Sequence, residues 1–145
     1  MKKLAIFFVA VAALAFASCS LLQSTSTNTV AQAAGQSCGG AMVNLYRSYK
    51  SSGKVDLSNA NNLANAVILA TGYSQLRQNK DDQSYRKSFT NGLVLSGAGL
   101  ITNANAGTIV NLLLNAQSLS GISQGSSAAQ TQAAATTLTT LLQLL

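Results

Sequence analysis

Histidine and glutamate are absent from this chain, and aspartate occurs only three times. General acid–base catalysis draws mostly on these three residue types, and a histidine-based triad is impossible without histidine. A metal site needs several clustered ligands, among which histidine is the commonest side chain. The composition therefore predicts a protein that is not an enzyme and that holds no metal and no cofactor.

Charge of either sign is also scarce. Without Lys2 and Lys3, which belong to the leader described below, seven basic residues face three acidic ones, a net charge of +4. The seven do not form a stripe in the sequence, whereas nucleic-acid-binding proteins cluster lysine and arginine along one face. We therefore expect no nucleic-acid partner.

The longest apolar run lies near the N-terminus and is short. Thirteen apolar residues (4–16) follow a positive stretch (2–3) and precede two small residues (17–18), the layout of a cleavable secretory signal. As a helix the run reaches about 20 Å, against a hydrocarbon core of about 30 Å. The competing interpretation, an uncleaved membrane anchor, would have to extend to Leu22 and bury residues 18–20.

The residues Phe16, Ala17, Ser18 and Cys19 resemble the lipobox of bacterial lipoproteins, in which an apolar residue and two small ones precede a cysteine. Phenylalanine stands here where leucine is usual. The resemblance implies that Cys19 receives a diacylglyceryl group and becomes the N-terminus of the mature chain. Several acyl chains would then hold the protein to a membrane, where one chain holds only marginally. Ser20, in place of aspartate, implies an outer-membrane location facing the periplasm.

A second cleavage site competes with the lipobox. Residues 15–17 form an A-x-A match, and cleavage before Ser18 would release a soluble periplasmic protein. In that oxidising compartment Cys19 and Cys38 would form a disulfide worth about 3 kcal/mol. If Cys19 is acylated instead, Cys38 has no partner within the chain. We then expect a buried apolar residue, or a thiol that joins two copies.

The chain divides into three predicted segments: a signal peptide at residues 1–18, a lipid-anchored polar tether at residues 19–36 and one helical domain at residues 37–145. The tether is rich in serine, threonine, asparagine and glutamine and shows no clear apolar period. Its later part, residues 30–34, is alternatively the start of the first helix.

Within the domain, apolar residues recur at helical spacing in five segments. The first segment ends at Gly53, Asp56 and Ser58 are candidate caps for the second, and Ser126 and Ser127 precede the last. The stripes are formed by Met42, Leu45, Tyr46 and Tyr49; by Ala60, Leu63, Ala64, Val67, Ile68 and Thr71; by Tyr85, Phe89, Leu93 and Leu100; by Ala106, Ile109, Val110 and Leu113; and by Leu138, Leu141, Leu142 and Leu145. The predicted fold class is all-α, a small helical bundle of about four to five helices.

Residues 90–111 are the ambiguous stretch. Turn dipeptides and short apolar runs make a partly β structure the alternative there, and each glycine within a helix costs about 1 kcal/mol relative to alanine. The segments on both sides have a clear helical period, which favours helix. The fourth helical segment is expected to stop near Gly121.

Charged residues gather between the second and third helical segments, at Arg77, Lys80, Asp81, Asp82, Arg86 and Lys87. The structural interpretation is that cations complement the end of one helix dipole while Asp81 or Asp82 caps the next helix. The functional alternative is a binding loop for an anionic lipid or a glycan.

These observations predict a structural or interaction protein of the cell envelope, whose partner is an envelope protein or a second copy. Such a protein should expose an apolar strip, either at residues 138–145 or at the small residues Gly92, Ser96, Gly97 and Gly99. The candidate interaction surface comprises Arg77, Lys80, Arg86, Lys87, Leu141 and Leu145. The alternative is a small-ligand-binding module whose pocket is lined by Tyr46, Tyr49, Tyr73 and Phe89.

Overall fold

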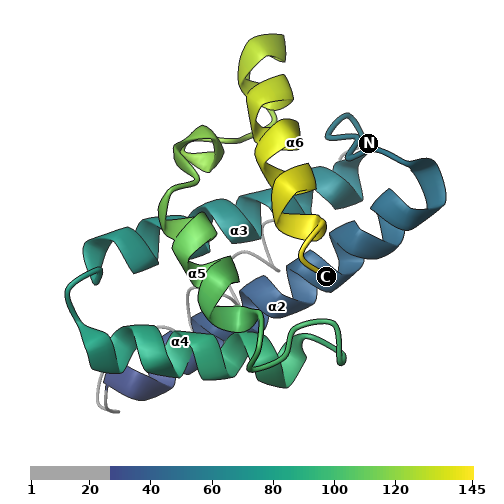
Figure 1. The fold of residues 1–145 in the computed structure, drawn as a ribbon. Helices are drawn as coiled ribbons and strands as arrows, with labels where there is room; N and C mark the ends of the chain where they lie inside the picture. The colour runs from purple at the N-terminus through teal and green to yellow at the C-terminus, as the bar shows by residue number, and fades with distance from the viewer. Residues whose placement is uncertain (1–26) are drawn as a thin grey trace, which may run out of the picture.

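The computed structural model describes residues 27–145, so the predicted signal peptide, Cys19 and the first part of the predicted tether lie outside the described residues. Within this range the chain forms five α-helices and one short 3-10 helix, and no strand: α2 (Thr27–Ser52), α3 (Ala60–Gln78), α4 (Gln83–Ser96), α5 (Ala106–Leu114), η1 (Gln117–Leu119) and α6 (Ala128–Leu142) (Figure 1). The predicted all-α bundle is confirmed. The partly β alternative for residues 90–111 is wrong, because these residues form the end of α4, a loop and the start of α5.

The first helix begins earlier than the sequence pattern predicts. Residues 27–36, assigned above to the tether, are the first turns of α2, so the alternative that residues 30–34 belong to the first helix is confirmed, and both Ala31 and Gly35 are buried. Their side chains are too small to produce an apolar stripe, but that smallness lets another helix pack closely. The predicted end of the helix is confirmed: Gly53 has a φ of 73°, and its amide donates to the carbonyl oxygen of Tyr49 at 2.7 Å.

The contacts between helices fix their directions. Helix α3 runs antiparallel to α2, since Cys38 lies against Ile68 and Gly72 while Asn44 lies further along α2 against Asn65. Helix α4 runs parallel to α2, because the backbone near Gly92 packs at Gly35 and that near Ser96 packs at Gly39. The turn between α3 and α4 therefore lies at the same end of the molecule as the start of α2, on the left of Figure 1.

Side-chain caps define three of the helix starts. Asn59 begins α3, where its Oδ1 accepts from the amides of Asn61 and Asn62, so the predicted caps Asp56 and Ser58 are wrong. Asp56 accepts instead from the Ser58 amide and hydroxyl in the preceding turn. Ser127 begins α6 in a capping box with Gln130, which confirms one of the two predicted serines.

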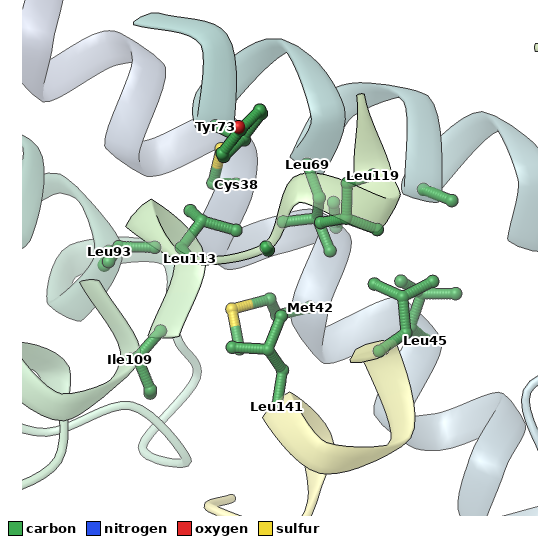
Figure 2. Packing of buried hydrophobic residues seen from close by; sticks show 14 of the residues in the cluster. Cys38, Met42, Leu45, Leu69, Tyr73, Leu93, Ile109, Leu113, Leu119 and Leu141 are labelled. Atoms are coloured by element: carbon green, nitrogen blue, oxygen red, sulfur yellow. The ribbon is translucent and has the colours of Figure 1, made fainter. Parts of the chain in front are cut away.

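A single core fills the space between the layer of α2, α3 and α4 and the covering elements α5, η1 and α6. Met42 of α2 lies at its centre, between Leu113 of α5 and Leu141 of α6, and Leu69 of α3 meets Leu119 of η1 (Figure 2). All five side chains are at most 1% exposed. Burying each of these side chains contributes about 1.5–3 kcal/mol to stability. Helix α4 adds Phe89 and Leu93 to the same core, so every element contributes to it. No helix among residues 27–145 is long and apolar enough to span a membrane.

Candidate functional site

The most strongly charged part of the described chain is the turn between α3 and α4. We call it the basic corner and define it by its four cations and two carboxylates: Arg77, Lys80, Asp81, Asp82, Arg86 and Lys87. Helix α3 closes where the Asn79 amide and side chain both donate to the Gln75 carbonyl. Helix α4 opens where the Asp82 carboxylate accepts from the Tyr85 amide at 2.9 Å. The prediction that an aspartate caps this helix is confirmed for Asp82.

Two of the four cations at the basic corner are held by neighbouring side chains. The guanidinium of Arg77 donates to the hydroxyl of Tyr73 and lies 5.9 Å from the centre of its ring. Arg86 donates through Nη2 to Oδ1 of Asn111 on α5 at 3.0 Å. Because Tyr73 is buried, these two contacts tie the guanidinium of the exposed Arg77 to a core residue. The ammonium groups of Lys80 and Lys87 are on exposed residues.

A shallow open groove of about 320 Å³ separates α4 from α5 beside this corner. Its walls combine hydrogen-bond donors with apolar surface, and they are formed by Gln83, Arg86, Lys87, Thr90, Gly107, Val110 and Asn111. Gly107 has no side chain to fill the α5 side of the groove, and a Cβ built there would meet no atom within 4 Å. Guanidinium, ammonium and amide groups on one rim suit the oxygens of an anionic group.

A second groove, of about 470 Å³, lies between α2 and the start of α3 and has a different chemistry. It is lined by Asn44, Ser48, Asn59, Asn61, Asn62, Ala64 and Asn65. Several of these amides are used within the fold. Asn44 donates to Asn65 at 3.5 Å, and Asn62 donates to the Asp56 carbonyl at 2.9 Å. These asparagines build the start of α3 and its contact with α2.

The structure separates the six residues of the predicted interaction surface into two groups. Arg77, Lys80 and Lys87 are exposed and Arg86 is half-buried, all at the basic corner. Leu141 is 1% exposed and packs in the core, so it forms no surface, and Leu145 is half-buried against the same core. The reason is that α2, η1 and α5 cover the apolar face of α6, which the sequence of α6 alone does not reveal.

Most of the other predicted surface residues are also internal, although Gly99 is exposed and Ser96 is half-buried. Gly92 and Gly97 are buried, because α2 packs against the backbone of α4 at Gly92 and Ile101 folds over Gly97. The four aromatic residues proposed as a pocket lining belong to the core or pack against it: Tyr73 and Phe89 are buried, and Tyr46 and Tyr49 are half-buried. None of the four lines either groove.

Cys38 is buried between α2 and α3, with 1% of its surface exposed, as predicted for a small apolar residue. Its Sγ lies 3.8 Å from the carbonyl oxygen of Ile68 and beside Tyr73 (Figure 2). Burial raises the pKa of the thiol to about 12. In this environment the thiolate, which is the reactive form, is suppressed at neutral pH.

Asn111 and Gln83 are residues of the first groove that sequence reasoning missed. Asn111 is exposed on α5, next to the buried pair Ile109 and Val110, and the helical period of the apolar residues indicated an exposed position there. The hydrogen bond between Asn111 and Arg86 depends on how α4 and α5 cross, which the sequence does not predict. No group of three or more potential metal ligands of the histidine, cysteine or carboxylate type occurs among residues 27–145.

No known family model, curated protein or solved structure significantly matches this chain.

Proposed function

We propose that this protein is an exported lipoprotein of the cell envelope, held to a membrane by acyl chains on Cys19, whose helical domain works through surface contacts rather than catalysis. The observation that carries the proposal is the N-terminal sequence: a positive stretch, thirteen apolar residues and the lipobox-like residues 16–19. The outer membrane, with the domain facing the periplasm, is the proposed location.

The position of Cys38 supports acylation of Cys19 over the soluble alternative. A Cys19–Cys38 disulfide requires the two sulfur atoms to approach to about 2 Å, with the Cα atoms roughly 4.4–6.8 Å apart. The Sγ of Cys38 is enclosed by α2 and α3, and a Cβ built at Gly72 would collide with it. A bridge would therefore have to open the contact between these two helices.

The exposed chemistry supports an interaction role. The basic corner and the groove beside it present guanidinium, ammonium and amide donors from α4 and α5 to solvent. Such a surface suits partners that carry phosphate or carboxylate groups.

Metabolic labelling tests the proposal directly. Cells that express the full-length protein are grown with labelled palmitate, alongside the variants Cys19→Ala and Cys38→Ala. We expect label on the wild type and on Cys38→Ala and none on Cys19→Ala. An unlabelled wild type, or label that persists in Cys19→Ala, would show that the protein is not a lipoprotein of this kind.

A further inference from the structure

The basic corner lies at the end of the domain where the chain enters it. Helix α2 begins at Thr27, and parallel packing places the start of α4 beside the start of α2. Antiparallel packing brings the end of α3 to the same place. Figure 1 shows the start of α2 and the α3–α4 turn on one side of the molecule. Lys80 and Lys87 therefore share this end with Thr27, the first residue that the structure describes.

The length of the chain before α2 limits how far this end can lie from an acylated Cys19. Seven residues separate Cys19 from Thr27, and the eight Cα-to-Cα steps between the two span at most about 29 Å when the chain is fully extended. Helix α2 is itself roughly 39 Å long, at 1.5 Å for each of its 26 residues. The start of α2 must therefore stay near the membrane, whereas its far end at Ser52 can stand well clear of it.

Net charge alone does not determine which end of the domain faces the membrane. The basic corner has four cations and two carboxylates, while the far end carries Arg47, Lys50 and Lys54 beside Asp56, so each end has a net charge of about +2 at neutral pH. Attraction to a charged surface falls off within a Debye length of about 8–10 Å at physiological salt. The end that the anchor holds close is the one that experiences this attraction.

We propose that the basic corner rests on anionic phospholipid headgroups around the acyl anchor and so fixes the orientation of the domain, with α2 rising away from the membrane. Lys80 and Lys87 make the contact from exposed positions, while Arg77 and Arg86 are held at the edge of it by Tyr73 and Asn111. The inference rests on the proposed acylation of Cys19. The acyl chains supply the anchor, and the basic corner supplies an electrostatic second signal.

Energy transfer to a lipid-bound acceptor measures the orientation. The full-length gene is expressed, and the acylated mature protein is purified and reconstituted into vesicles of phosphatidylcholine with or without phosphatidylglycerol. A donor dye is placed on Gln78→Cys at the basic corner or on Ser51→Cys at the far end. Both positions are exposed, whereas native Cys38 is buried and should not react. The charge reversals K80E/K87E and K50E/K54E remove equal charge from opposite ends and are introduced into each labelled protein.

We expect stronger transfer from position 78 than from position 51 in vesicles that contain phosphatidylglycerol. The difference should shrink without the anionic lipid, at high salt, and in K80E/K87E, but not in K50E/K54E. Equal transfer from both positions, or an equal effect of both charge reversals, would overturn the inference. Intact mass of the same samples separates the two proposals: an acylated protein without preferred orientation contradicts only the inference, and a protein without acyl chains contradicts the proposed function.

Discussion

Gly35 of α2 and Gly92 of α4 face each other where the two helices cross, and a Cβ built on Gly35 would lie 3.1 Å from the Cα of Gly92. The same Cβ would collide with the carbonyl oxygen of Phe89, and a Cβ on Gly92 would collide with that of Gln32. Both obstacles are backbone atoms, which a side-chain rotation cannot remove. The parallel pairing of α2 and α4, and with it the position of the basic corner, depends on this contact.

Gly92→Ala should therefore destabilise the protein, although alanine favours the helix. Overpacking costs roughly 1–3 kcal/mol, and the upper end of this range applies because the neighbour is rigid backbone. Helix propensity returns about 1 kcal/mol, so we expect a net loss of about 2 kcal/mol. The control is Gly40→Ala on α2, where a Cβ meets no atom within 4 Å. This control should stabilise by about 0.5–1 kcal/mol. Urea denaturation of both variants checks the prediction, and equal effects of one sign would refute the close contact.

The buried thiol of Cys38 should make stability depend on pH in the alkaline range. Its pKa is raised from 9.0 to about 12 by burial, so the folded state retains a proton that the unfolded state loses. Below pH 9 the thiol is protonated in both states and the free energy of unfolding is at its full value. It falls as the pH rises from 9 towards 12, because the unfolded state loses the proton first. In Cys38→Ala the decline of unfolding free energy with pH should be shallower over this window. Parallel curves for the two proteins would contradict the assignment.

The cap at the start of α4 provides a second comparison. Asp82→Ala removes the acceptor for the Tyr85 amide and should cost about 1 kcal/mol. Asp81 is adjacent, exposed and outside the helix, so Asp81→Ala should change stability by less than about 0.5 kcal/mol. Thermal denaturation of the two variants at neutral pH distinguishes them. A larger loss for Asp81→Ala would mean that the cap is wrongly assigned.

Two leucines that look alike in the sequence should respond differently to truncation. Leu141 is 1% exposed and Leu95 is 63% exposed. Leu141→Ala should cost about 2–5 kcal/mol because it opens a cavity beside Met42. Leu95→Ala should cost less than about 1 kcal/mol, since it leaves no cavity. If Leu141→Ala were tolerated and disrupted only association with a partner, α6 would present the interaction surface that the sequence pattern suggested.

The sequence was informative wherever a large apolar residue repeats at helical spacing. The Met42 stripe and the Leu138 stripe predicted α2 and α6 because their periods are regular and their side chains large. The first turns of α2 were only the alternative interpretation of residues 30–34, because Ala31 and Gly35 carry too little apolar surface to stand out from polar neighbours. Gly35 packs against Phe89 and Gly92, more than fifty residues later, and a helical period does not specify a partner so distant in the chain.

The same limit applies to the candidate site. The cluster of Lys80, Arg86 and Lys87 was visible as a run of charge, and the cap at Asp82 followed from the rules for helix starts. Leu141 was assigned to the surface because a leucine stripe at a chain end looks the same whether or not another element covers it. The covering of α6 by α2, η1 and α5, and the pairing of Arg86 with Asn111, arise from tertiary packing.

The intact mass of the mature protein, expressed at full length in a bacterial host, tests the central claim most directly. The account predicts a mass equal to residues 19–145 plus a diacylglyceryl group, usually with one further acyl chain, and the loss of that addition in Cys19→Ala. A mass equal to unacylated residues 18–145, lighter by the two hydrogens of a Cys19–Cys38 disulfide, would contradict it. That result would identify a soluble exported protein and would require the packing around Cys38 to differ from the structure described above.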